Sequence, residues 1–305
     1  SVLLFSFLVN GGIWSVFFAS AGIVWFHMNF AWLPILILGV VMVTRFFAEK
    51  IIEWKKIGAV IGGILVGWLL RPEAINAAKL FYIQVFQLIF KKGSGVPLLF
   101  GNEYYPLQWI TLLRNFGLVT VLWVLAMIVF VIIARKRQLP QKTLIWSSFI
   151  LSVLFFLLTM LFSLRAYDLW LPFNLLFVAM ALTYIVPAFS FRWKQALNQA
   201  GITILAIVFV FLAPYSIYKT SVSFSERAYQ PERLKETALW FKDNSKDGDI
   251  VFNVNWSRFS ELFFWNQKNY YLSGLDPIFQ YAYSPSLYWK YHYLAAGLLT
   301  DKTCG

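Results

Sequence analysis

The chain has 305 residues, of which 60% are hydrophobic and only 13% are charged, and its formal net charge is +12. Soluble globular domains carry about 25% charged residues, so this composition excludes an ordinary soluble domain and indicates an integral membrane protein. No basic-aromatic motif for nucleic acid accompanies the positive charge. We therefore expect membrane lipids, and not nucleic acid, as partners.

The chain begins at Ser1 inside an apolar run, without Met, a basic region or a small-residue cleavage motif. Residues 1–10 are typical of the tail of an earlier membrane span. We therefore expect a fragment that lacks its natural N-terminus. The one cysteine, Cys304, excludes a disulfide framework within the chain and a cysteine-based metal site.

Along the chain, several apolar windows are long enough, or nearly long enough, to cross the roughly 30 Å hydrocarbon core as helices. They are expected at residues 11–27, 31–47, 57–71, 116–134, 143–163, 169–189 and 201–217. The predicted fold class is a polytopic α-helical membrane protein with a small C-terminal extracytoplasmic α/β domain. The membrane domain is predicted over residues 1–217 and the α/β domain over residues 218–305.

A long connection, residues 72–115, separates the third and fourth predicted spans. It is too polar at both ends to cross a membrane and too apolar in its middle to lie freely in water. An amphipathic helix at the membrane interface, over roughly residues 74–90, followed by a loop with Gly and Pro, fits this mixture.

Basic residues collect in three connections, at 45–56, at 135–142 and around Arg192 and Lys194. Short basic loops stay in the cytoplasm, and these three fall on one side of the membrane if the predicted spans are correct. We therefore predict a plasma-membrane protein whose remaining connections, and everything after Lys219, face outward.

The segment after residue 218 carries nearly balanced acidic and basic residues and reads as alternating elements. A helix is predicted in PERLKETALWFKDNS, a strand at IVFNV, a short helix opened by Ser257 and a second strand at NYYLSG. This order indicates the βαβ-like start of an α/β domain whose sheet is incomplete, so we expect truncation at the C-terminus too.

Several stretches resemble a known family: VWFHMNFAW, GVPLLFGNEYYP, LRAYDLWLPF and FNVNWSRFSELFFWNQKNYYLSGLDPIF. They look like the later part of bacterial and archaeal polytopic membrane proteins related to C-type (GT-C) glycosyltransferases, namely the protein mannosyltransferase-like and oligosaccharyltransferase-like enzymes. The resemblance covers most of the chain. It implies transfer of a sugar from a polyprenyl-phosphate carrier to an acceptor on the outer face. The acidic motif of such enzymes would precede Ser1, and the membrane part contains no DxD or ExD.

Sugar transfer from a lipid phosphate needs a cation, either a basic side chain or a divalent metal ion, to hold the leaving phosphate. Arg165 is the candidate for the phosphate, and Tyr167 and Asp168 are candidates for fixing it or for contacting sugar hydroxyls. The structural alternative is an Arg165–Asp168 pair that tethers a tight turn, with Tyr167 and Trp170 as anchors in the headgroup layer.

The same chemistry usually needs a carboxylate to orient or deprotonate the acceptor. Glu103 is the catalytic candidate, and its structural alternative is a solvated loop residue or a salt bridge to Arg71, Lys91 or Arg114. His27 is a candidate phosphate or metal ligand, with a locally hydrogen-bonded histidine between two spans as the alternative.

Polar residues near the predicted strand ends, Asn253, Asn255, Trp256 and Asp276, mark a ligand site or simply shape the backbone.

Two classes of function then compete with the glycosyltransferase. One is a transporter or flippase, although residues 116–163 carry few of the polar or broken-helix features expected at the midplane. The other is a membrane scaffold that binds envelope partners.

Overall fold

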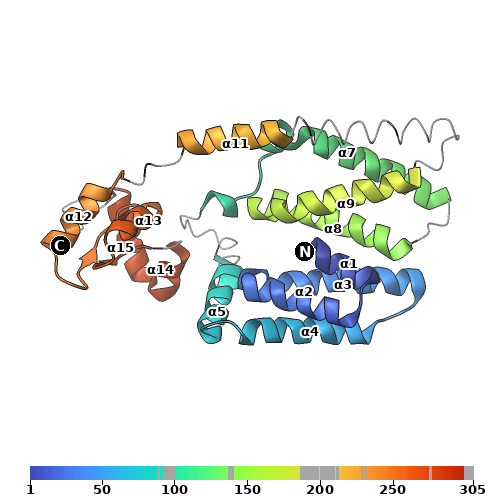
Figure 1. The fold of residues 1–305 in the computed structure, drawn as a ribbon, viewed down its shortest axis with the longest axis horizontal. Coiled ribbons are helices and arrows are strands. Elements are labelled where there is room, and N and C mark those ends of the chain that lie inside the picture. Colours follow the sequence, from blue (N-terminus) through green and yellow to red (C-terminus); the bar gives the residue numbers. More distant parts are fainter. Residues whose placement is uncertain are drawn as a thin grey trace. The chain divides into compact units, whose positions relative to one another are not determined.

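The computed structural model describes residues 1–87, 90–91, 101–136, 141–185, 199, 210, 213–227, 230, 232–274 and 277–298 (Figure 1). The chain divides into two compact units. Unit 1 holds the described residues up to Ile185, and unit 2 holds those from Gln199 onward. The expected boundary at residue 217 therefore lies inside unit 2, within helix α11 (Ala213–Arg227).

Unit 1 is helical, and its longer helices coincide with the first six predicted spans. Its elements are α1 (Val2–Asn10), α2 (Ile13–Phe26), η1 (Met28–Phe30), α3 (Trp32–Glu49), α4 (Trp54–Leu69), α5 (Ala74–Phe81), η2 (Tyr82–Gln87), η3 (Asn102–Tyr104), α7 (Trp109–Lys136), α8 (Lys142–Leu161), η4 (Leu164–Ala166) and α9 (Tyr167–Ile185). The seventh predicted span, 201–217, lies largely outside the described residues.

Within the described part of the chain, three helices are long and apolar enough to cross a membrane: Met28–Glu49, Trp109–Ile132 and Lys142–Leu161. A fourth crossing arises if the bent pair of α4 with α5–η2 counts as one span. The described part of the chain is thus that of a helical protein with three or four candidate membrane spans.

The helix expected near residues 74–90 is present as α5 continued by η2, and it turns 114° away from α4. Its exposed side chains include Ile75, Tyr82 and Phe86. A sharp turn followed by an apolar exposed face is typical of a helix that lies along an interface.

Helix α2 packs along α4 through small residues (Figure 1). A Cβ atom on Gly67 would lie 2.3 Å from the carbonyl oxygen of Ala21, and one on Gly63 would lie 2.5 Å from that of Phe17. Only glycine therefore permits this close backbone approach.

The other helices of unit 1 join through buried aromatic side chains. Phe5 of α1 meets Phe173 of α9 edge-on at 5.6 Å between ring centroids, and Trp123 of α7 meets Trp170 of α9 at 5.9 Å. Each such pair adds about 1 kcal/mol beyond the burial of its area. Helices α1, α7 and α9 are therefore held by one shared core.

A buried ionic network lies where α1 and α3 end and α4 begins. Arg45 donates to the carbonyl of Val9 at 2.6 Å, and Lys56 donates to that of Leu8 at 2.8 Å, so the last carbonyls of α1 gain partners. Glu53 forms ion pairs with both cations. Two charges of the first basic connection thus have a structural role.

Unit 2 contains α11, α12 (Lys235–Asn244), β1 (Ile250–Val251), η7 (Trp256–Arg258), α13 (Phe259–Trp265), β2 (Tyr270–Tyr271), α14 (Pro277–Tyr283) and α15 (Pro285–Ala295). The two strands pair in parallel, with Ile250 opposite Tyr270. The predicted βαβ order is confirmed, although each strand is only two residues long.

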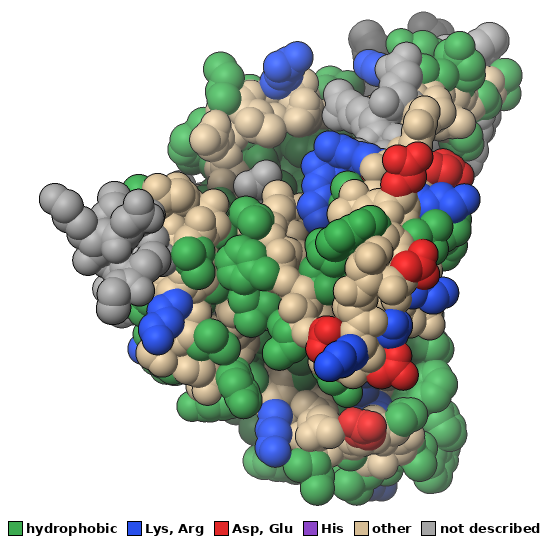
Figure 2. Space-filling model, turned by 90° about the vertical axis from the view of Figure 1, so that its left-hand side faces the viewer, with side chains coloured by type: hydrophobic (Ala, Val, Ile, Leu, Met, Phe, Trp, Pro, Cys, Tyr) green, Lys and Arg blue, Asp and Glu red, His purple; other side chains and the backbone are tan. Residues whose placement is uncertain are grey.

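Two local predictions in unit 2 were wrong. The helix expected to start near Pro231 starts at Lys235. The short helix expected to open at Ser257 is α13, which begins at Phe259. Ser257 lies in the preceding η7, which is capped by the Asn255 side chain through a hydrogen bond from the Ser257 backbone at 3.0 Å. Figure 2 shows acidic and basic side chains side by side with hydrophobic ones on one face of the molecule.

Candidate functional site

The loop that carries Glu103 is fixed to the turn between α8 and α9. The Leu164 backbone nitrogen donates to the carbonyl of Tyr105 at 2.8 Å, and the Ser163 hydroxyl donates to the carbonyl of Glu103 at 2.7 Å. Segments about sixty residues apart in sequence are therefore held at fixed spacing. Glu103 and Arg165 are brought together in this way.

Glu103 and Arg165 form an ion pair with 3.1 Å between Oε1 and Nη2. The guanidinium also lies over the Tyr104 ring, 4.9 Å from its centroid, and donates to the Tyr104 hydroxyl at 3.3 Å. A Cβ atom on Gly101 would lie 2.5 Å from the Glu103 carboxylate, so glycine leaves room for it. The Arg165 side chain is still 48% exposed, which leaves it accessible to a ligand.

The Arg165 side chain lines a cavity of about 700 Å³ in unit 1, which we call the Arg165 cavity. Its polar lining comes from Arg165, Asn29, Gln84, Tyr104 and Ser163. The rest of the lining is apolar: Phe30, Trp32, Val85, Leu158, Leu161, Phe162, Ala166 and Leu169. Among the described lining residues, Arg165 is therefore the one charged group at a largely apolar cavity.

Asn29 presents an unused acceptor in this lining. Its side-chain nitrogen donates to Gln84 Oε1. Its side-chain oxygen is buried and has no hydrogen-bond partner among the described residues. A buried acceptor without a donor is costly, so a hydroxyl-bearing ligand would find a partner here.

His27 lies at the turn between α2 and η1, with its ring 4.8 Å from that of Phe30. Partial burial and the positive charges of Arg165 and Arg71 lower the pKa of His27 below its usual value of 6.5. The imidazole is therefore neutral at pH 7, and its electrostatic environment includes Arg165.

The structure leaves Tyr167 and Asp168 out of the cavity lining. The Tyr167 ring packs 4.2 Å from that of Phe116. Asp168 is exposed in the first turn of α9, where a carboxylate is favoured by the helix dipole. In the described part of the chain Arg165 forms its ion pair with Glu103 and not with Asp168, so the Arg165–Asp168 tether is not formed.

The described residues contain no group of three or more His, Cys, Asp and Glu that could hold a metal ion. Among the described residues that line the cavity, the cation is Arg165.

The polar residues of unit 2 near the strand ends have structural partners. Asn253 bonds both the backbone nitrogen and the carbonyl of Ser273, and Asn255 caps η7. Asp276 lies outside the described residues. These contacts support the interpretation that they shape the backbone.

Sequence reasoning missed Asn29, Gln84 and Tyr104 as cavity residues. Asn29 lies close in sequence to His27, and Tyr104 follows Glu103, both of which were selected as candidates. Gln84 belongs to the predicted interfacial helix. The segments that hold these three residues were therefore recognisable in the sequence, but only the fold brings the three side chains to one cavity.

Comparison of the chain with protein-family models, with curated proteins and with solved structures gave no significant match. The geometry of the site is therefore the basis for assigning a function to this chain.

Proposed function

We propose that the protein is a membrane glycosyltransferase-like protein that binds a polyprenyl-phosphate-linked sugar in the Arg165 cavity. The observation that carries the proposal is the combination of one guanidinium with a mostly apolar lining. A lipid phosphate has the same two parts, an anionic group and a long apolar chain. The planar guanidinium group of arginine suits the phosphate because it can donate two parallel hydrogen bonds to it.

The remaining lining residues suit the other parts of such a donor. Trp32, Leu161 and Leu169 offer apolar surface to the first isoprene units. The unpartnered Asn29 oxygen accepts a hydrogen bond from a sugar hydroxyl. Neutral His27 adds no further positive charge, so Arg165 is the residue that holds the phosphate.

Glu103 is the candidate base in this proposal. An incoming phosphate competes with Glu103 for Arg165, which releases the carboxylate toward an acceptor. In the transfer step the acceptor oxygen bonds to the anomeric carbon, the bond from that carbon to the phosphate oxygen breaks, and the phosphate keeps the electron pair. Arg165 stabilises the developing charge, and Glu103 takes the acceptor proton.

The positions of the basic connections support placement of this cavity on the outer face of the plasma membrane, with unit 2 extracytoplasmic. In that orientation, η1, η3 and η4 lie at the outer end of the spans, where the headgroup of a polyprenyl phosphate resides.

A flippase or transporter is the second candidate, favoured by Asn174 in α9. Asn174 is fully buried, and both its side-chain nitrogen and its oxygen have no partner among the described residues. The indole nitrogen of Trp170, one helical turn earlier, is also unpartnered within the described chain. Polar groups inside a helix bundle are typical of transport pathways.

Substitution of Arg165 tests the binding step. Farnesyl phosphate and undecaprenyl phosphate are titrated into the full chain in detergent, with uncharged farnesol as the ligand control. Arg165→Lys keeps the charge but loses the fork, so we expect about tenfold weaker phosphate binding, and Arg165→Ala weakens it further. Arg114→Ala, at an exposed arginine of α7 outside the cavity lining, serves as the matched control.

Unchanged phosphate affinity in an Arg165→Ala protein with an unaltered melting temperature contradicts the proposal. A second assay separates the two candidates once binding is established. Release of undecaprenyl phosphate from an undecaprenyl-phosphate sugar supports transfer and should be lost in Glu103→Gln. Movement of the intact lipid across vesicle membranes, without release, supports the flippase.

A further inference from the structure

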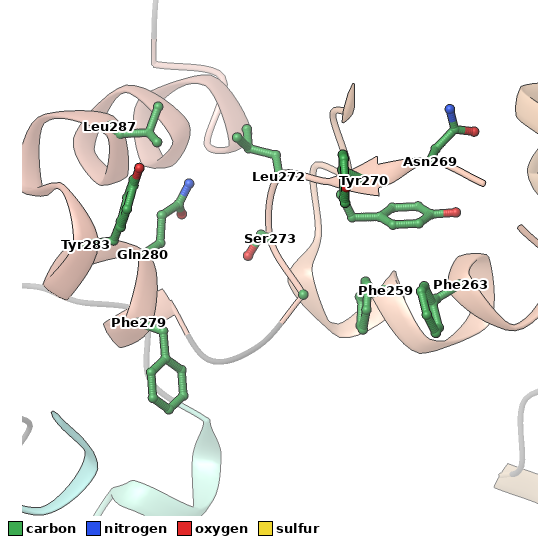
Figure 3. Close-up of a pocket in the computed structure, with 12 residues that line it drawn as sticks. Phe259, Phe263, Asn269, Tyr270, Leu272, Ser273, Phe279, Gln280, Tyr283 and Leu287 are labelled. Carbon is green, nitrogen blue, oxygen red and sulfur yellow. The ribbon is translucent and has the colours of Figure 1, made fainter. Parts of the chain in front are cut away.

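Unit 2 contains a second cavity, of about 650 Å³, called here the aromatic cavity. Its lining comes from α13, from β2 and the residues after it, and from α14 and α15 (Figure 3). Half of its lining residues are Phe or Tyr. Cavities of roughly 300–1,000 Å³ with few polar groups are typical of small-molecule sites.

Phe259 and Phe263 of α13 form a stacked aromatic wall, with ring centroids 5.1 Å apart and planes 28° apart. Gly274 makes room for this wall, because a Cβ atom there would lie 3.2 Å from the Phe259 ring. Phe263 is 41% exposed, so an aromatic surface remains available to a ligand. The partly positive C–H groups of a sugar ring pack on the partly negative face of such rings.

Gln280 of α14 supplies a polar group to this cavity (Figure 3). Its side-chain nitrogen and oxygen are both buried, and neither has a hydrogen-bond partner among the described residues. The other amide in the lining is engaged, since Asn269 donates to the Ser245 hydroxyl at 2.7 Å. Gln280 therefore offers one donor and one acceptor, which two neighbouring hydroxyls on one ligand can satisfy together.

The described residues of the lining are Phe, Tyr, Leu, Gly, Asn, Ser and Gln, so these residues present no charged side chain to a ligand at neutral pH. A phosphorylated lipid or an acidic peptide gains no counter-charge here. A purely apolar ligand would pack on the rings but would leave the Gln280 amide buried and unpartnered, which costs about 1–3 kcal/mol.

We propose that the aromatic cavity binds a neutral glycan chain. One pyranose ring of the chain packs against Phe259 and Phe263, and two hydroxyls of another ring exchange hydrogen bonds with the Gln280 amide, which lies across the Leu272–Ser273 segment from the two Phe rings (Figure 3). This inference uses residues of unit 2 alone and does not depend on lipid binding in unit 1.

The test is a titration of the full chain, in nanodiscs, with cellotetraose, mannotetraose and chitotetraose, followed by saturation-transfer NMR. Glycosidic detergents are avoided because their sugar headgroups would compete. At least one tetrasaccharide is expected to bind through its ring C–H protons. Phe263→Ala and Gln280→Leu should each weaken that binding about tenfold. Phe263→Tyr, which keeps an aromatic face, should retain it.

Phe264→Ala is the matched control, because Phe264 is exposed on the same helix and does not line the cavity. Arg165→Ala should leave sugar binding unchanged, which separates this proposal from the one for unit 1. The proposal is wrong if none of the three sugars binds the folded protein, or if the affinity is the same in Phe263→Ala and Gln280→Leu. Binding of 1-octanol without any sugar would likewise overturn it and show an apolar groove.

Discussion

Arg165 influences its surroundings through its charge as well as through its hydrogen bonds. It pairs with Glu103, lies over Tyr104 and helps to lower the pKa of His27. Sequence reasoning selected Glu103, Arg165 and His27 from their residue types and their positions at predicted span ends. It did not predict the pairing of Glu103 with Arg165, because these residues are 62 positions apart and meet only through the folded loop.

The pKa of His27 reports the Arg165 charge directly. Because burial and nearby positive charge both lower it, Arg165→Ala should move the His27 pKa upward toward 6.5. The measurement is an NMR pH titration of the imidazole resonances, with His292→Gln to assign them. Arg114→Ala, which removes a charge that does not contribute to the shift, should leave the pKa unchanged.

The sign of the linked stability effect follows from the same shift. Above pH 6.5 both the folded and the unfolded forms hold His27 neutral, and as pH falls the unfolded form takes up the proton first. His27 therefore lowers stability progressively as pH falls through 6.5 toward its folded pKa. A His27 pKa at or above 6.5 in the folded wild type would contradict this description of the site.

Helices as elements were predictable because an apolar window of nearly twenty residues has few other stable forms in a membrane. Their ends depend on local details that hydropathy does not carry. Residues such as Lys50 and Gln141 adopt left-handed backbone at helix ends, and η4 forms at a turn that was predicted only as a connection. Helix α15 was not predicted, although Ser284 caps it and Pro285 opens it.

Packing between α2 and α4 gives a prediction for an element. Gly67→Ala should destabilise the protein by about 1–3 kcal/mol, because the added Cβ meets the Ala21 backbone and the helices must separate. Gly58→Ala is the control on the same helix, since a Cβ there meets nothing within 4 Å. Melting temperatures of both variants in one detergent give the comparison. Equal melting temperatures would show that the close approach of α2 and α4 is not required.

At the scale of the whole molecule, the division into a helical part and a smaller mixed part was predictable from hydropathy and charge. The predicted boundary at residue 217 lies within α11, whose first residues, 213–217, belong to the apolar stretch that was predicted as the seventh span. Within the described residues the sheet is also smaller than its aromatic and β-branched residues indicate, since Ile250–Val251 pairs with Tyr270–Tyr271 and no further strand joins them there. Strand length depends on the neighbouring strands that are available for hydrogen bonding, which is not a local property.

Orientation of the whole molecule yields the last prediction. The basic connections favour a cytoplasmic location for Lys50, at the end of α3, and for Lys142, at the start of α8, whereas Asp168 and Lys246 are expected outside. All four side chains are exposed within their own units, so a cysteine at each should be reactive wherever the reagent can reach it.

The four single cysteines are introduced into a Cys304→Ser background, and intact cells are treated with an impermeant thiol reagent. Cysteines at residues 168 and 246 should label in intact cells, and those at 50 and 142 should label only after the membrane is opened. Labelling at 50 and 142 in intact cells would place the Arg165 cavity on the cytoplasmic side, where a donor that acts on the outer face cannot reach it. Because the opened-cell sample shows that every cysteine is reactive, lack of labelling in intact cells reports sidedness and not burial.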